Sequence, residues 1–183
     1  MNTAEDRLPG DPTAEQLVEQ MIRVDHAGEY GAVRIYAGQL AVLGRDPEAG
    51  AAIRAMAAKE REHLAAFEKL VGDRHVRPTA LQPLWHVAGF ALGAATALMG
   101  PRAAMACTVA VEEVIDRHYG AQAAQLGDDE TELKSAIERY RADELAHRDE
   151  ALAHGAAAAP GYEALTTAVK AASRLAIWLS TRI

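Results

Sequence analysis

Apolar residues recur every three or four positions along most of the chain, the spacing that places them on one face of an α-helix. The pattern predicts helices over about 14–43, 47–71, 102–126, 129–154 and 162–181, with a further apolar helix inside 81–99. No stretch alternates apolar and polar residues as a half-buried strand does. The sequence therefore predicts an all-α protein.

Polar residues at three helix starts support these boundaries. Thr13 and Gln16 have the spacing of a capping box at the first helix. Asp46, followed by proline, is the predicted N-cap of the second helix. Asp128 or Asp129 is expected to cap the fifth.

The length of 183 residues suits one domain that buries a sizeable core. Residues 1–12 are polar and contain two prolines and a glycine, so we expect a flexible lead followed by a helical domain over 13–183. Half of the chain is hydrophobic and only 5% is aromatic, which favours helices over a β-sandwich.

The segment 78–101 contains no Asp, Glu, Lys or Arg. Its apolar part, Leu84 to Met99, is shorter than the roughly 20 residues that a membrane-spanning helix needs. It is predicted to be a long connection between two helical hairpins. Two interpretations stay open, a helix lying in one leaflet of a membrane or a helix buried within the bundle or at a subunit contact.

Charge and cysteine usage narrow the function classes. The formal net charge is −7, which argues against a nucleic-acid binder, because phosphate contacts need clustered Lys and Arg. Cys107 is the single cysteine, which excludes an internal disulfide and a thiolate zinc site. No secretory or transit pattern is visible in the first residues, so we expect a bacterial cytoplasmic setting or a mature chain.

Two Glu-x-x-His motifs carry the candidate chemistry, because positions i and i+3 share one face of a helix. Each motif is preceded by a lone glutamate at nearly the same distance, 31 and 32 residues. The candidate metal ligands are Glu29, Glu60, His63, Glu112, Glu144 and His147. Two glutamates and two Glu-x-x-His motifs on four helices are the ligand set of di-iron and di-manganese carboxylate bundles.

Four carboxylates in one core need positive charge, because buried like charges repel and lose hydration. Carboxylate oxygens suit hard iron or manganese ions, and imidazole nitrogens complete the set. Each lone glutamate is expected to join the motif that follows it around one metal ion. Glu60 and Glu144 are expected to bridge the two ions.

The alternative interpretation is a set of solvated charged faces. Glu112 argues against it, because an almost wholly apolar stretch, 103–111, precedes it. Glu112 is preferred to Glu113, since Tyr119 lies on its face of the helix whereas Glu113 suits pairing with Arg117. Asp143 is either a hydrogen-bond partner of a ligand histidine or a surface residue.

Three glycines interrupt the first helix around Glu29. Gly28, Gly31 and Gly38 each cost about 1 kcal/mol relative to alanine inside a helix. Either they let a neighbouring helix or a ligand approach closely, or they mark a weak point or a kink.

Several blocks together resemble the demethoxyubiquinone hydroxylase family of ubiquinone biosynthesis. The most specific is RVDHAGEYGAVRIYAGQ at 23–39, and others are CTVAVEE at 107–113, His-Tyr at 118–119 and Asp-Glu-x-x-His at 143–147. The resemblance covers roughly residues 20–183, and all six ligand positions of the family are matched.

The resemblance implies a ferritin-like four-helix bundle with a long hydrophobic connecting helix and an additional C-terminal helix. It implies two iron ions per chain, with manganese as the second choice, and O₂ as co-substrate. The implied reaction is hydroxylation of the ring of a demethoxylated ubiquinone precursor. One oxygen atom enters the substrate and the other forms water, with two electrons from an external donor, for which NADH has been proposed.

The resemblance also implies roles and partners. Tyr119 and His118 are candidates for positioning the quinone ring or relaying protons and electrons, although His118 also fits a polar surface position. A polyprenyl quinone is the expected substrate, met through peripheral contact of about residues 81–99 with the cytoplasmic face of the bacterial inner membrane. A lipid-binding accessory protein and a homo-oligomer are further expected partners.

Two rival functions stay open. A different ferritin-like enzyme, either a ferroxidase or a tRNA hydroxylase, shares the ligand set, although the acidic charge disfavours tRNA. A non-catalytic helical scaffold that binds the lipid precursor would tolerate replacement of all six ligands.

Overall fold

A computed structural model describes residues 10–183, and all regular structure in that range is helical, which confirms the all-α prediction. Most of the predicted lead, residues 1–9, lies outside the described residues. The helices are α1 (Ala14–Leu43), α2 (Ala49–Asp73), α3 (Gln82–Leu98), α4 (Pro101–Gln125), α5 (Thr131–Ala153) and α6 (Tyr162–Ser180), with short 3₁₀ turns η2 (Asp128–Glu130) and η3 (Ala156–Ala158).

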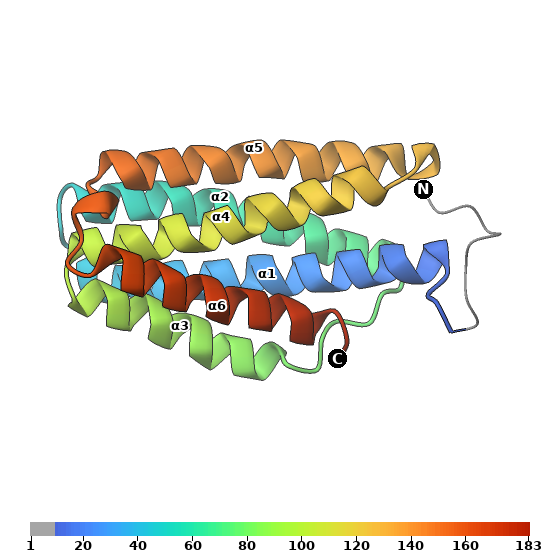
Figure 1. Ribbon diagram of the computed structural model, residues 1–183, viewed down its shortest axis with the longest axis horizontal. Helices are drawn as coiled ribbons and strands as arrows, with labels where there is room; N and C mark the ends of the chain where they lie inside the picture. Colours follow the sequence, from blue (N-terminus) through green and yellow to red (C-terminus); the bar gives the residue numbers. More distant parts are fainter. Residues whose placement is uncertain (1–9) are drawn as a thin grey trace.

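The six helices stack in three layers of two (Figure 1). Helices α2 and α5 form one outer layer, α1 and α4 the middle layer, and α3 and α6 the other outer layer. The first three helices and the last three thus occupy corresponding places. Helices α1, α2, α4 and α5 form the four-helix bundle of a ferritin-like fold, as predicted, and α3 and α6 are the predicted connecting and C-terminal helices.

The predicted start of the first helix is confirmed, whereas the second helix begins at Ala49, two residues later than predicted, with Glu48 rather than Asp46 at the N-cap position. The Thr13 hydroxyl accepts a hydrogen bond from the Gln16 backbone N–H at 3.1 Å, and the Gln16 side chain accepts one from the Thr13 N–H at 2.8 Å. Asp46 Oδ1 accepts hydrogen bonds from the backbone N–H groups of Glu48 and Ala49, so it caps the turn that leads into α2.

The predicted cap of the fifth helix is wrong. Asp128 and Asp129 lie inside the 3₁₀ turn η2, and Glu130 occupies the position before α5 without a capping side-chain bond. The Glu130 carboxylate instead accepts two hydrogen bonds from the Arg74 guanidinium, at 2.9 and 2.8 Å. An ion pair between the ends of two helices has therefore taken the place of a local cap.

Helices α1 and α3 pack with their backbones in close approach. A Cβ atom added at Gly38 would lie 2.2 Å from the Phe90 carbonyl oxygen, and one added at Gly93 would lie 1.9 Å from that of Ile35. Side chains do not fit at these positions, so the close-approach interpretation of Gly38 is confirmed. The helix α1 continues without a break from Ala14 to Leu43.

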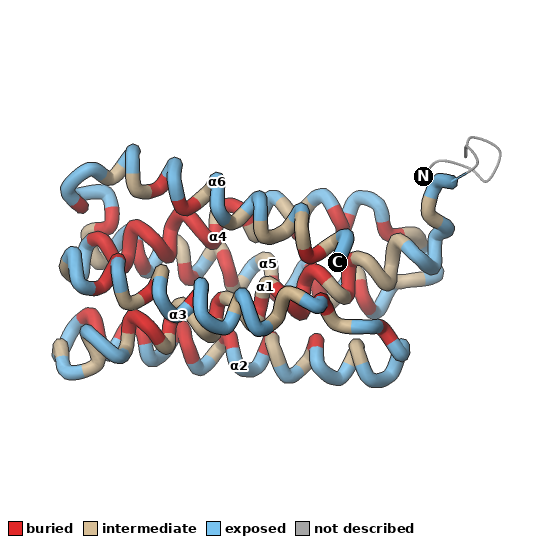
Figure 2. Tube along the Cα trace, turned by 90° about the horizontal axis from the view of Figure 1, so that it is seen from below, coloured by how far each residue is buried: buried red, intermediate tan, exposed pale blue. Residues whose placement is uncertain are grey.

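The core follows the middle layer. Burial is nearly continuous along the first three turns of α4, whose residues 103–112 are all buried (Figure 2). The outer layers expose one face each. Large fully buried side chains include Ile22, Phe67, Met105 and Ile137. Each contributes roughly 1.5–3 kcal/mol through removal of apolar surface from water.

Large apolar side chains are exposed on the layer that α3 and α6 form. On α3 the exposed fractions are 66% at Val87 and 76% at Leu98, and on α6 they are 56% at Leu175 and 52% at Trp178. Within residues 10–183, no helix combines the length and the apolar character that crossing a membrane requires. The uncharged segment therefore exposes part of its apolar surface, and α6 exposes more in the same layer.

Candidate metal centre

The four bundle helices bring all six predicted ligands into one buried cluster. Helices α1 and α4 each supply a glutamate, and α2 and α5 each supply Glu-x-x-His. All six residues are buried, and Glu144 is fully enclosed. The exposed fractions are Glu29 2%, Glu60 1%, His63 1%, Glu112 2%, Glu144 0% and His147 7%.

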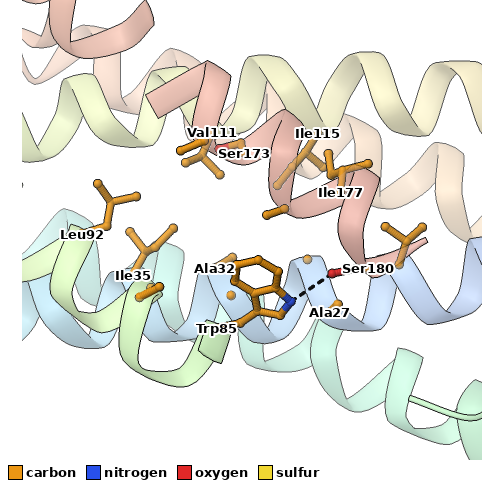
Figure 3. Close-up of a pocket in the computed structure, with 17 residues that line it drawn as sticks. Ala27, Ala32, Ile35, Trp85, Leu92, Val111, Ile115, Ser173, Ile177 and Ser180 are labelled. Carbon is orange, nitrogen blue, oxygen red and sulfur yellow. Dashed lines mark hydrogen bonds between the residues drawn. The ribbon is translucent and has the colours of Figure 1, made fainter. Parts of the chain in front are cut away.

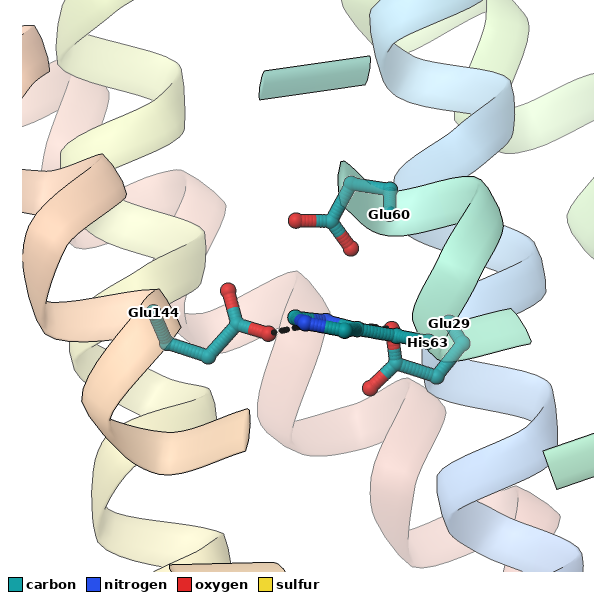
Figure 4. Close-up of side chains that lie close together, drawn as sticks. All are labelled: Glu29, Glu60, His63 and Glu144. Carbon is teal, nitrogen blue, oxygen red and sulfur yellow. Dashed lines mark ion pairs between the residues drawn. The ribbon is translucent and has the colours of Figure 1, made fainter. Parts of the chain in front are cut away.

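The ligand atoms fall into two groups that overlap. One group contains Glu29, Glu60, His63 and Glu144, whose ligand atoms all lie within 4.8 Å of one another. Figure 4 shows the carboxylates of this group around the His63 ring. The shared spacing allows one ion to contact all four residues.

The second group contains Glu60, Glu112, Glu144 and His147, again within 4.8 Å. Glu60 and Glu144 belong to both groups, which is the place that the sequence predicts for bridging ligands. Each lone glutamate lies in the group that contains its own motif, as expected. The arrangement therefore offers two adjacent ion positions.

Unpartnered buried atoms indicate that this cluster fits metal ions. His63 Nδ1 lies 3.2 Å from a Glu144 oxygen, and His147 Nδ1 lies 2.9 Å from a Glu60 oxygen. None of these four atoms has a hydrogen-bond partner of suitable geometry. Buried polar atoms are normally satisfied, so facing lone pairs left without partners match the requirements of a cation. The cluster can hold metal ions.

The ionisation of the cluster supports the same conclusion. Burial, reinforced by the charge of Glu144, raises the pKa of the Glu29, Glu60 and Glu112 carboxyl groups. Burial also opposes ionisation of Glu144, but the neighbouring imidazoles of His147 and His63 outweigh it and lower its pKa to about 2. The protein alone thus compensates only part of the negative charge, and cations would compensate the remainder.

Two buried tyrosines contact the cluster. The Tyr36 hydroxyl donates a hydrogen bond to Glu112 Oε1 at 2.9 Å, and the Tyr119 hydroxyl donates one to Glu29 Oε1. Burial and the adjacent carboxylates raise the pKa of both phenols well above its ordinary value, so they act as donors. Sequence reasoning found Tyr119 but missed Tyr36, although each follows a lone glutamate by seven residues.

Asp143 is a hydrogen-bond partner of a candidate ligand histidine, which was one of the two alternatives that the sequence left open. Its Oδ2 lies 3.0 Å from His63 Nε2, so it contacts the histidine of the other motif. Lys59 lies 3.6 Å from the same oxygen. The ring of Tyr140, which sequence reasoning also missed, packs on His63 with centroids 4.5 Å apart. The hydrogen bond to Asp143 fixes the orientation of the imidazole.

His118 lies outside the cluster but is not a free surface residue. Its Nε2 is 3.2 Å from Oδ1 of Asp25, a buried residue that also accepts a hydrogen bond from Gln122 at 2.8 Å. Burial raises the pKa of Asp25, and His118 offsets part of that effect. The His118 side chain remains 23% exposed, so the pair joins the protein surface to the first helix one turn before Glu29.

The neighbour of Glu112 behaves differently from expectation. Glu113 forms an ion pair with Lys170 of α6 at 2.6 Å rather than with Arg117. The expected i,i+4 pair is wrong because α6 packs against α4 and places a lysine within reach. Glu113 is therefore outside the cluster, as the choice of Glu112 required.

An apolar pocket of about 270 Å³ lies between the middle layer and the layer of α3 and α6, on the opposite side of the middle layer from α2 and α5 (Figure 3). Its walls come from α1, α3, α4 and α6 and include Val111 and Ile115 of α4. Trp85 projects into it and donates a hydrogen bond from Nε1 to Ser180 Oγ at 3.0 Å. Gly28 and Gly31, which bracket Glu29, also line it, and a Cβ atom at either would meet nothing within 4 Å.

The fold and the cluster define a class, the ferritin-like helical proteins whose buried carboxylate and histidine groups can hold metal ions. Within that class, the family model of the ubiquinone biosynthesis protein COQ7 matches residues 16–180. The chain belongs to this family. The family resemblance found in the sequence is thereby confirmed.

Relatives agree with this membership. The chain is 59% identical over 181 residues to the 3-demethoxyubiquinol 3-hydroxylase of Rhodospirillum rubrum, which covers 99% of this chain and 85% of the relative. It is 50% identical over 177 residues to the human mitochondrial NADPH-dependent 3-demethoxyubiquinone 3-hydroxylase, with 94% and 81% covered. The Saccharomyces cerevisiae mitochondrial 5-demethoxyubiquinone hydroxylase is 42% identical, with 91% and 78% covered.

Proposed function

We propose that this protein is an O₂-dependent monooxygenase of ubiquinone biosynthesis that hydroxylates the ring of a demethoxylated ubiquinone precursor. The observation that carries the proposal is the pair of buried ligand groups that share Glu60 and Glu144, in a chain of the COQ7 family. The hydroxylase names of its relatives support the substrate and the reaction.

The six clustered residues would hold two iron ions. Carboxylate and imidazole donors without sulfur suit iron, with manganese as the second choice. When bound, iron supplies the reduction of O₂ that a carbon-based side chain does not provide. The chain contributes the buried ligand atoms, the tyrosine donors and an enclosure that excludes bulk water from them.

The reaction balances with two external electrons. One oxygen atom of O₂ is inserted into a ring C–H bond to give a hydroxyl group, and the other leaves as water with two protons. Several relatives are named NADPH-dependent hydroxylases, which supports a reduced nicotinamide nucleotide as the electron donor, and NADH belongs to the same chemical class.

The apolar pocket is the proposed binding site of the quinone. It is lined almost wholly by apolar side chains, as a ring with a polyprenyl tail requires, and an iron path of a ferroxidase would need polar ones. Gly28 and Val111 line the pocket and directly precede Glu29 and Glu112 in the chain. The ring in this pocket would therefore lie against the helices that carry the cluster.

The exposed apolar layer would contact the membrane from which the substrate comes. Segment 81–99 presents Val87 and Leu98, and α6, the other helix of this layer, presents Leu175 and Trp178. The pocket lies between α3 and α6 on one side and the middle layer on the other. A quinone dissolved in the membrane would therefore enter the pocket from the exposed layer that α3 and α6 form. The proposed location is peripheral, on the cytoplasmic face of the bacterial inner membrane. A lipid-binding accessory protein and a second copy of the chain are the further proposed partners.

His118 and Tyr119 are the proposed catalytic side chains outside the ligand set. The Tyr119 hydroxyl is already engaged by Glu29, which places a proton at the edge of the cluster. The partly exposed His118 and its partner Asp25 would carry protons between solvent and this part of α1.

Lipid extraction from a strain that lacks the gene would test the function. We expect demethoxyubiquinone to accumulate and the wild-type gene to restore ubiquinone. Glu112→Ala and His147→Ala should fail to restore it, whereas Glu113→Ala, whose side chain pairs with Lys170 outside the cluster, should succeed. Anaerobically loaded wild-type protein should bind about two iron ions per chain.

Two results would overturn the assignment. Accumulation of a different intermediate would exclude the substrate. Full ubiquinone production by both ligand variants would show that the cluster is dispensable and would favour a lipid-binding scaffold.

A further inference from the structure

The two tyrosines at the cluster cross between the halves of the chain. Tyr36 of α1 donates to Glu112 of α4, and Tyr119 of α4 donates to Glu29 of α1. Each tyrosine lies two helical turns after the lone glutamate of its own helix, yet it contacts the glutamate of the other helix. Each lone glutamate is thus held from the opposite half.

The same exchange recurs one turn further along. Gln39 and Gln122 each follow a lone glutamate by ten residues. Gln39 donates to Thr108 Oγ1 at 3.4 Å, and Gln122 donates to Asp25 Oδ1 at 2.8 Å. Thr108 and Asp25 each lie four residues before the lone glutamate of the other helix. The tyrosine contacts are therefore part of a repeated register between α1 and α4.

The tyrosine hydrogen bonds make the two carboxylate oxygens of each lone glutamate unequal. In both residues Oε1 accepts the phenol hydrogen bond, and Oε2 is buried without a hydrogen-bond partner. An ionised carboxylate only accepts, so the phenol donates and occupies one lone pair of Oε1. Oε2 of Glu29 and Oε2 of Glu112 are the oxygens that no hydrogen bond occupies.

The shared glutamates lack such a partner. Neither oxygen of Glu144 has a hydrogen-bond partner, and neither has Oε1 of Glu60. Within residues 10–183, no tyrosine hydroxyl donates a hydrogen bond to either of them. The two kinds of glutamate thus differ in how many oxygens the protein leaves open.

We propose that Tyr36 and Tyr119 are positioning residues that restrict Glu112 and Glu29 to one metal-binding oxygen each. A carboxylate held in this way would occupy less of the space around a bound ion than one that binds through both oxygens, and so would leave room for a further ligand. The inference rests on the proposed metal centre. It adds that Tyr36 positions Glu112 and that Tyr119 positions Glu29.

The variants Tyr36→Phe and Tyr119→Phe remove only the hydroxyl group. Tyr140→Phe is the matched control, because Tyr140 is also buried and packs on His63 through its ring, while its hydroxyl contacts Arg139 rather than a glutamate. All three proteins should keep the helical content of the wild type by circular dichroism.

The measurement is anaerobic titration with Co(II), followed by calorimetry and visible absorption. Loss of a hydrogen bond beside a ligand typically costs 10- to 100-fold in metal affinity. We expect each single variant to weaken one of two binding steps by about that factor and the double variant to weaken both. The visible absorption of the affected step should fall, because Co(II) absorbs more weakly when a second oxygen raises its coordination number.

Unchanged affinities and spectra in both folded tyrosine variants would overturn the proposal, and so would equal changes in Tyr140→Phe. Failure of the metal centre itself is a separate outcome. In that case the wild type would bind no Co(II), or Glu112→Ala would bind as much Co(II) as the wild type.

Discussion

The glycines beside Glu29 yield a prediction in which stability and binding change in opposite directions. Gly28 and Gly31 lie inside α1, and an added Cβ atom would project into the pocket without touching any protein atom within 4 Å. Alanine at either position should therefore stabilise the metal-free fold by about 1 kcal/mol through helix propensity. For a chain of this length, that corresponds to about 2–4 °C in the unfolding midpoint.

The same methyl group should weaken quinone binding. Extra methyl groups in a filled apolar site typically cost about 1–3 kcal/mol, which is about 5- to 150-fold in the dissociation constant. The pocket of about 270 Å³ leaves little spare space around a substituted ring. Gly28→Ala and Gly31→Ala should each show this loss.

Trp85 provides the assay, because its ring projects into the pocket and a bound quinone would quench its fluorescence. The titration uses a short-tailed benzoquinone and a Trp178→Phe background, which removes the second, surface-exposed tryptophan. Gly72→Ala is the control, since an added Cβ there also meets open space but lies at the end of α2, away from the pocket.

Equal binding by the wild type and both pocket variants would refute the assignment of this pocket to the quinone. The reasoning would also fail if Gly72→Ala weakened binding as much as they do. A fall in stability in either variant would show that the space beside α1 is filled by protein.

Two further predictions concern ionisation and the membrane. The raised carboxyl pKa values of Glu29, Glu60 and Glu112 mean that the folded metal-free protein binds more protons than the unfolded chain, so its unfolding midpoint should be higher at about pH 5.5 than at about pH 7.5. Iron loading should remove this gain, and a midpoint that falls on acidification of the metal-free protein would contradict it. Leu98→Glu should reduce co-sedimentation with phospholipid vesicles, whereas Leu152→Glu on α5 should not. Both sites are exposed, so stability should change by less than about 0.5 kcal/mol, and equal vesicle binding by the two variants would exclude contact through α3.

The sequence predicted the parts of this molecule that local spacing determines. Helix periodicity gave the six helices, and the two Glu-x-x-His motifs with their lone glutamates gave the residues that meet in the cluster. Spacing was sufficient here because positions three apart share a helix face whatever the tertiary packing.

Other features depend on how separate helices are aligned. The hydrogen bond from Tyr36 to Glu112 requires the relative register of α1 and α4, which periodicity within one helix does not contain. The pair between Glu113 and Lys170 requires the position of α6. The same holds for the pocket, whose walls come from four helices.

The three-layer arrangement has a consequence for how the two halves diverge. Each half resembles one member of an isologous dimer, and the short connection at 99–100 makes them a single chain. A symmetric dimer would have to carry every substitution twice. In the fused chain, α1 has Gly28 where α4 has Val111, so the first half leaves space in the pocket and the second half fills part of it with a side chain. Both halves still supply a glutamate and a tyrosine to the cluster. Fusion thus permits a one-sided cavity for an asymmetric molecule beside a centre that remains nearly two-fold.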